Sequence, residues 1–329
     1  MTKKNQNNQG FTLVELMVAM AISLVVMGAI FLTFKSQQDS YVIQSRVTDT
    51  QQNLRAAMYM LTRDIQMAGY YTNFDGDQYT MDWDDLDGDT EPIRPLIFGQ
   101  NNVPGGSGVK NNTDEIVIVK ANTITSASII NFGVLGDNDS AAGNTITLND
   151  LVVGAGDNEI DLNDSGKRFG LMVKQGLGMA EFFEITQGSG GPPFSTTVGS
   201  GFTETYGPGD LIYKVDVVIY RIDEDATNPS LLRRNLGSDN GYQVVAENID
   251  NLQFKYLLND GTWTNNPTTL QVPDVRAVEI SLLARTANIN RGYTDTNSYN
   301  IGDNPNPTPN DGYRRKLLCS IVKTRNIGL

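Results

Sequence analysis

The sequence predicts an α+β fold, in which one long hydrophobic N-terminal α-helix packs on an antiparallel β-sheet globular domain with additional β-rich insertions. Three observations predict this fold. The chain has an uninterrupted apolar run near its start, and the apolar residues after that run recur at helical spacing. The remainder contains many short strand-like segments separated by turn residues.

The apolar run covers residues 11–34 and predicts the first half of the helix. Its only formally charged residue is Glu15. At about 1.5 Å per residue, a helix of this length is long enough to cross a bilayer. A carboxylate is costly in such a segment, so we expect Glu15 to need a partner.

The second half of the helix, residues 35–69, is amphipathic. We expect the charged residues Arg63 and Asp64 to lie off its apolar stripe, and Gly69 to be the C-cap. The residues of the stripe, spaced by four and three, are Leu54, Met58, Leu61, Ile65 and Ala68.

Strand patterns dominate the rest of the chain. Within Leu211–Ile222, apolar and other residues alternate as in a strand with one well-buried face. The segment Gly188–Gly201, rich in glycine, serine and proline, is expected to be a mobile loop. The segment Asn300–Gly312, with three prolines and several asparagines, is expected to be an exposed connection before the last strand. The predicted strands are Glu115–Ala121, Ser128–Phe132, Thr145–Leu148, Phe169–Lys174, Glu181–Thr186, Leu211–Ile222, Gln243–Ala246, Leu252–Leu258, Val275–Arg285 and Lys316–Lys323.

An acidic, loop-like segment covers residues 70–112. Dense carboxylates of this kind provide the oxygen ligands that calcium prefers, but an EF-hand loop is not present because Trp83 stands at the first ligand position. Both a calcium site and a solvated acidic loop fit the pattern. The candidate ligands are Asp82, Asp84, Asp85, Asp87, Asp89 and Glu91.

Composition limits the possible functions. The 329 residues carry a net charge of −13, which argues against broad nucleic-acid binding. The chain has no histidine, which removes the commonest general base and transition-metal ligand. Its one cysteine, Cys319, forms no internal disulfide and is expected to be a packed thiol in a strand. We therefore expect no enzymatic activity, and no cofactor other than the calcium above.

The start of the chain carries a recognisable motif. Gly10 is followed by Phe11-Thr12-Leu13-Val14-Glu15 and by the apolar run. This combination resembles the class III leader of type IV pilins and of type II secretion pseudopilins. An ordinary secretory signal has its cut site after the apolar region, whereas here the candidate site precedes it, so the helix would be retained.

The resemblance implies how the N-terminus is processed and used. Prepilin peptidase would cut between Gly10 and Phe11 and methylate the new amine of Phe11, and Glu15 would be the assembly glutamate. It divides the chain into a leader at 1–10, a membrane and filament-core half of the helix at 11–34, an amphipathic half at 35–69 and a globular domain at 70–329. That domain includes the acidic loop 70–112.

The C-terminal third extends the resemblance. Motifs at Val244–Tyr256, Val275–Leu283 and Tyr313–Lys316 are similar to those of the PilW family of minor pilins. Membership would imply a part in type IV pilus assembly or priming, at or near the pilus tip.

The resemblance also implies partners and a location. The partners would be the major pilin, other minor pilins, prepilin peptidase, the inner-membrane assembly platform, membrane lipid and a PilY-type tip adhesin, with no direct nucleic-acid partner. The protein would cross the inner membrane once, with its globular domain in the periplasm, before it enters the pilus at the cell surface.

Two alternatives remain open at this point. A minor pseudopilin of the GspJ type in type II secretion shares the leader and the helix-plus-sheet design, and neighbouring genes would distinguish it. A pilin-anchored binding module or enzyme is the other alternative, but no phosphate-binding glycine loop or histidine-based site supports it.

Overall fold

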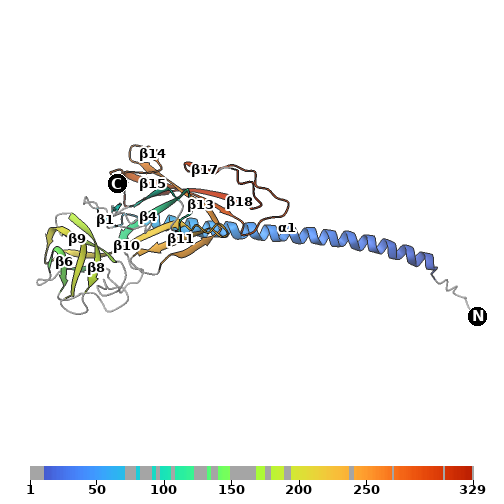
Figure 1. Cartoon of the computed structure of the whole chain (residues 1–329), viewed down its shortest axis with the longest axis horizontal. Coiled ribbons are helices and arrows are strands. Elements are labelled where there is room, and N and C mark those ends of the chain that lie inside the picture. Colours follow the sequence, from blue (N-terminus) through green and yellow to red (C-terminus); the bar gives the residue numbers. More distant parts are fainter. Residues whose placement is uncertain are drawn as a thin grey trace, which may run out of the picture. The chain divides into compact units, whose positions relative to one another are not determined.

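The computed structural model describes the chain in segments. These are residues 11–70, 79–81, 91–93, 97–104, 108–121, 132–134, 140–148, 168–174, 179–188, 194–236, 241–268, 270–306 and 308–327. The chain divides into two compact units, Met1–Asp49 and Thr50–Leu329. The fold is α+β, with one long helix and antiparallel sheets, as the sequence predicts (Figure 1).

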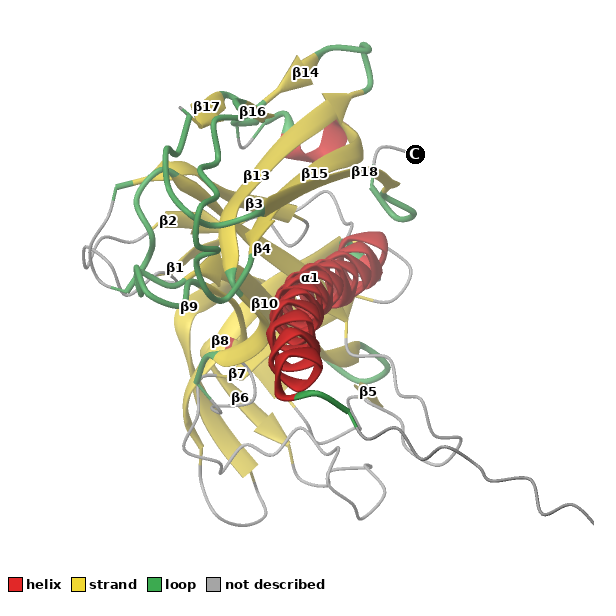
Figure 2. Cartoon of the chain, turned by 90° about the vertical axis from the view of Figure 1, so that its right-hand side faces the viewer, coloured by secondary structure: helices red, strands yellow, loops and turns green. Residues whose placement is uncertain are grey.

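The helix α1 runs from Leu13 to Met67. Its end matches the predicted end to within one residue. Gly69 has a φ of 72°, in the left-handed region that glycine adopts without strain, so the chain can leave the helix there. Residues 50–67 of α1 belong to the second unit and pack against its sheets (Figure 2).

The largest sheet has ten strands and is built around β10 (Leu211–Ile222). One half of β10 pairs with both β5 and β7, and the other half pairs with both β4 and β11, all antiparallel. The other strands of this sheet are β3 (Ile97–Val103), β4 (Thr113–Ala121), β5 (Phe132–Val134), β6 (Ser140–Leu148), β7 (Arg168–Lys174), β8 (Met179–Gly188), β9 (Phe194–Tyr206), β11 (Ser230–Asn235) and β12 (Gln243–Glu247).

A second sheet holds the C-terminal strands in the order β14-β13-β15-β18. Two short hairpins, β1-β2 and β16-β17, and the 3-10 helix η2 (Val272–Asp274) complete the described elements. The strands concerned are β13 (Ile249–Leu258), β14 (Trp263–Thr264), β15 (Val275–Arg285), β18 (Arg315–Lys323), β1 (Tyr79–Met81), β2 (Glu91–Ile93), β16 (Tyr299–Ile301) and β17 (Asn304–Asn306).

Two hydrophobic clusters form the core, and β10 contributes to both. Val218 and Tyr220 join the cluster that also contains the apolar stripe of α1, whereas Val217 and Ile219 join the second cluster with Phe169 and Leu171. Successive side chains of a strand point to opposite faces, so β10 is buried on both. The prediction of a single buried face was therefore incomplete.

Most predicted strands are confirmed to within a few residues, although Ser128–Phe132 lies mostly outside the described residues. Two loop predictions are wrong in part. Within 70–112, β3 is a strand because its edge pairs with β4. Within Gly188–Gly201, β9 begins at Phe194 and pairs with β6 and β8, so tertiary pairing overrides a composition typical of loops.

Two predictions near the C-terminus also need correction. Asn300–Gly312 is not simply an exposed connection, because it contains parts of the β16–β17 hairpin. Cys319 lies in a strand as predicted, but its side chain is exposed. It faces the same side of the sheet as Ser281, its partner on β15, whereas Val322 of the same strand turns into the core.

Candidate assembly site

Reciprocal hydrogen bonds between Thr12 and Glu15 cap the N-terminus of α1. The Thr12 backbone N–H donates to Glu15 Oε2 at 2.9 Å, and the Thr12 hydroxyl donates to the same oxygen at 3.0 Å. The Glu15 N–H donates in turn to Thr12 Oγ1 at 3.3 Å. This is a capping box, which satisfies backbone donors that the first helical turn leaves unpaired.

The apolar side chains that follow the cap on α1 are not buried against any other part of the described chain. Phe11 is 91% exposed, and the large apolar side chains from Leu13 to Phe34 are at least half exposed. The most apolar window of α1 has a mean hydropathy of 2.5 and is 0% buried, and the helix is long enough to cross a membrane. So large an apolar surface needs lipid or other helices around it.

The other end of α1 is fixed to the second unit by packing. The predicted apolar stripe is confirmed, since all five of its residues are buried. Thr50 is buried as well and its hydroxyl donates to the Arg285 carbonyl of β15 at 3.3 Å. Residues 50–67 therefore belong to the core of the head, which we define as the unit Thr50–Leu329.

A buried charge cluster lies at the end of this packed segment. Asp64 accepts from Lys120 Nζ at 2.6 Å, from the Tyr220 hydroxyl at 2.6 Å and from Arg233 Nε at 3.0 Å. Burial acts to raise the pKa of Asp64, but the two cations and the hydroxyl outweigh it and hold this pKa below its usual value. The prediction that Asp64 lies off the buried face was wrong, because ionic partners on the sheet compensate its burial.

The chain after the helix extends the main sheet. The Gly69 N–H donates to the Val119 carbonyl, and the Ala121 N–H donates to the Tyr70 carbonyl, both at 2.9 Å. Asn326, near the C-terminus, donates its amide to the Ala68 carbonyl at 3.2 Å and so caps an unpaired helix carbonyl. This contact joins the C-terminal part of the head to the end of α1.

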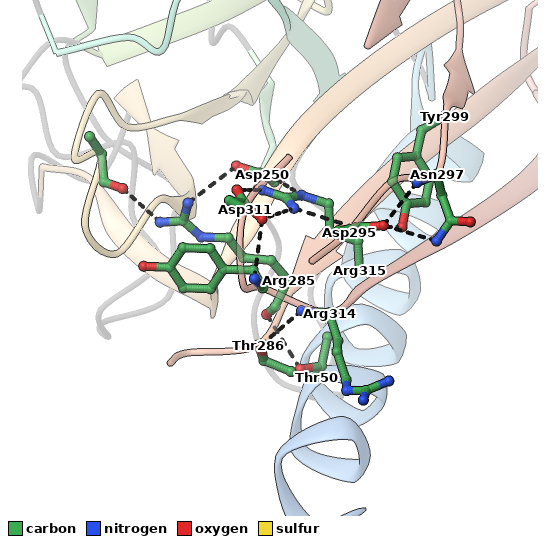
Figure 3. Close-up of polar contacts among 12 residues, drawn as sticks. Thr50, Asp250, Arg285, Thr286, Asp295, Asn297, Tyr299, Asp311, Arg314 and Arg315 are labelled. Carbon is green, nitrogen blue, oxygen red and sulfur yellow. Dashed lines mark hydrogen bonds and ion pairs between the residues drawn. The ribbon is translucent and has the colours of Figure 1, made fainter. Parts of the chain in front are cut away.

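A second ionic cluster ties the long connection 286–314 to the C-terminal sheet (Figure 3). Arg315 binds Asp250 at 2.7 Å and Asp311 at 2.7 Å, and its contact with the fully buried Asp295 is 3.4 Å. Lys110 binds the other oxygen of Asp250 at 2.6 Å. These cations hold the pKa of Asp250 below its usual value in spite of its burial, and Arg315 does the same for Asp311.

The structure describes some of the predicted site residues and not others. Phe11 and Glu15 lie together at the exposed start of α1, whereas Gly10 is outside the described residues. Of the calcium candidates, Glu91 has its backbone in β2, and nothing is described of its side chain. The candidates outside the described residues are Asp82, Asp84, Asp85, Asp87 and Asp89.

Sequence reasoning missed two features of these sites. The capping box had a local signal, since Thr12 stands three residues before Glu15 at the start of an apolar run. The pairing of Asp250 with Arg315 had none, because 65 residues separate the two side chains and only the sheet brings them together.

Comparison with known proteins identifies the type of chain. A family model described as Type IV Pilus-assembly protein W matches residues 219–326, and one described as the prokaryotic N-terminal methylation motif matches residues 5–31. The N-terminus and the C-terminal third of the chain therefore match a PilW-type pilin. The first match contains the whole C-terminal sheet with the Asp250–Arg315 cluster, and the second contains Gly10, Phe11 and Glu15.

One solved structure is distantly similar to the chain. A solved type IV-like pilin from Thermus thermophilus is similar to this pilin with 13% sequence identity and a TM-score of 0.35, over 84% of this chain and 97% of that one. No curated protein matches the chain. The apolar helix and the methylation motif are those of a membrane-anchored pilin, and pilins are in general not enzymes.

Proposed function

We propose that this PilW-type pilin is a minor pilin that takes part in type IV pilus assembly and priming, at or near the pilus tip. Prepilin peptidase would cleave between Gly10 and Phe11 and methylate Phe11. The observation that carries the proposal is the uncovered apolar helix, which starts at a carboxylate and ends in the core of a folded head. Such a helix can exchange lipid for neighbouring helices without unfolding the head.

Glu15 has a defined role in this exchange. In the single chain its carboxylate is bonded to the N–H and hydroxyl of Thr12. In a bundle of helices it would also meet the positively charged amine of Phe11 on a neighbouring subunit, in surroundings of low dielectric where an ion pair needs its partner most. The capping box keeps the carboxylate at the helix start, close to where that amine would arrive.

The proposal extends to the location and the partners of the protein. Before assembly the apolar half of α1 would cross the inner membrane, with the head in the periplasm, and afterwards the subunit would stand in the pilus at the cell surface. Its partners would be prepilin peptidase, the major pilin, the other minor pilins and the assembly platform. If the subunit stands at the pilus tip, a PilY-type adhesin would be a further partner. We expect no direct nucleic-acid partner.

Mass spectrometry of the N-terminal peptide tests the processing step. We expect a methylated Phe11 terminus in both the membrane and the sheared-filament fractions. An intact leader in filaments, or a cut after the apolar run, would contradict the proposal. Loss of pili without loss of type II secretion in a deletion strain would separate the role from that of a GspJ-type pseudopilin.

Replacing Glu15 with alanine tests the assembly step. We expect normal amounts in the membrane and a reduction of roughly tenfold or more in sheared filaments, because a lost ion pair in low dielectric is worth more than about 1.4 kcal/mol. Asp39→Ala is the matched control, since it removes an exposed carboxylate from the same helix. Equal incorporation of the Glu15→Ala and Asp39→Ala proteins would refute the role of Glu15.

A further inference from the structure

One buried carboxylate in the head, that of Asp114, is held by backbone N–H groups. Asp114 of β4 is 2% exposed, and its two oxygens accept the backbone N–H groups of Asn102 at 2.9 Å and Phe254 at 2.7 Å. Among the described residues, no lysine or arginine forms an ion pair with it. Asp64 and Asp250, which are buried to a similar degree, each have at least two cations.

A second carboxylate stands close to the first. Asp303, in the turn between β16 and β17, accepts from the Asn101 amide at 2.9 Å, so the adjacent residues Asn101 and Asn102 contact one carboxylate each. Burial and the negative charge of Asp303 raise the pKa of Asp114 to about 7. Asp303 itself is exposed, which leaves the cluster open to solvent on that side.

Three residues that adjoin these carboxylates each have a buried amide oxygen without a hydrogen-bond partner. Gln253 of β13 is 0% exposed, and its Nε2 donates to the Asn112 carbonyl at 3.1 Å, while its Oε1 accepts nothing. A Cβ on Gly302 would lie 3.2 Å from this Oε1, which places the oxygen at the turn that carries Asp303. The Oδ1 atoms of Asn101 and Asn102 are also buried and without partners.

These atoms together form oxygen-rich surroundings that would suit a cation. Each unsatisfied buried acceptor costs about 1–3 kcal/mol, and native structures leave few of them. Two carboxylates close together favour a shared positive charge, and each uncharged amide contributes a further oxygen. Two carboxylates with several amide oxygens and no nitrogen or sulfur ligand suit calcium, which accepts six to eight oxygens in flexible geometry.

We propose that Asp114, Asp303 and the amide oxygens of Asn101, Asn102 and Gln253 form a calcium site in the head. It joins three parts of the chain, namely the β3–β4 hairpin, β13 and the β16–β17 turn. These parts belong to three different sheets, so a bound ion would hold the sheets together at this point (Figure 2). Two carboxylates give a modest affinity, in the range of about 10⁻⁴–10⁻³ M that is usual for extracellular calcium modules.

This site is distinct from the acidic segment 82–91 and does not depend on the role in pilus assembly. No group of three or more carboxylate, cysteine or histidine side chains in the described part of the chain is placed to hold a metal. The proposed site has only two carboxylates, because three of its five side-chain ligands are amides.

Thermal unfolding of the full-length pilin in detergent tests the proposal. In millimolar CaCl₂, compared with EDTA, we expect the wild-type Tm to rise by several degrees, and equal MgCl₂ to raise it less. Asp303→Asn keeps the acceptor for Asn101 but removes one charge, and should abolish most of the shift and weaken calcium binding in calorimetry at least about tenfold. Asp260→Asn, in the exposed turn after β13, should retain the wild-type shift.

Several results would overturn the proposal. They are the absence of a calcium shift in the wild type, an equal shift with magnesium, and a shift that Asp303→Asn leaves unchanged, which would place the ion elsewhere. If Asp303→Asn does not fold, Asn101→Ala takes its place, because it retains both carboxylates and removes one ligand. Calcium affinity unchanged by Asn101→Ala would also refute this ligand set.

Discussion

Replacing Asp64 with alanine tests how the head holds the end of α1. The substitution removes the acceptor of Lys120 and Arg233 but leaves both cations in place, with their side chains 15% and 23% exposed. Breaking a buried ion pair by removing one partner costs about 3–5 kcal/mol. Because both cations retain some access to water, we expect the lower end, about 3 kcal/mol.

Urea denaturation of the full-length pilin, followed by circular dichroism, would measure this loss. An expected decrease of about 3 kcal/mol corresponds to a Tm lower by roughly 5 °C for a unit of this size. Arg63→Ala is the matched control, because Arg63 precedes Asp64 in the same helical turn and is exposed. It should change the free energy of unfolding by no more than about 0.5 kcal/mol.

A double-mutant cycle makes the same test sharper. Combining Asp64→Ala with Lys120→Met removes the carboxylate and one of the cations that it leaves unpaired. The double variant should therefore be more stable than the sum of the single losses predicts, by about 0.5–3 kcal/mol. Strict additivity, or an Asp64→Ala protein as stable as Arg63→Ala, would show that the cluster does not anchor the helix.

Two further predictions concern the head. The lowered pKa values of Asp250 and Asp311 stabilise the fold above the unfolded aspartate value of about 3.9, so the Tm should fall as these two groups become protonated below about pH 4. Asp311→Asn should reduce the size of that fall, and an unchanged acid profile would contradict this cause. Gly170→Ala should cost roughly 1–3 kcal/mol, because a Cβ there would overlap the Phe183 ring on the paired strand. Gly207→Ala, where nothing lies within 4 Å, is its control, and equal stability of the two variants in a urea titration would refute the clash.

Much of the fold could be predicted from local patterns. The limits of α1 follow from the apolar run, from helical spacing and from Gly69, because these signals depend on neighbouring residues alone. The strands β10 and β15 have the predicted bounds for the same reason. The predictions failed where partners override composition, as in β3 and β9, which are strands because other strands pair with them.

The sequence by itself determined the family signature, the apolar helix and the place of Glu15, since each of these is written in a contiguous segment. Only the tertiary structure decided that Asp64 is buried, that Asp250 meets Arg315, and that Asp114 lies near Asp303 and forms no ion pair within the described part of the chain. The burial of Asp64 and Asp250 depends on cations distant in sequence, and periodicity carries no information about those partners. The chemistry of the head therefore depends on which strands the fold places side by side.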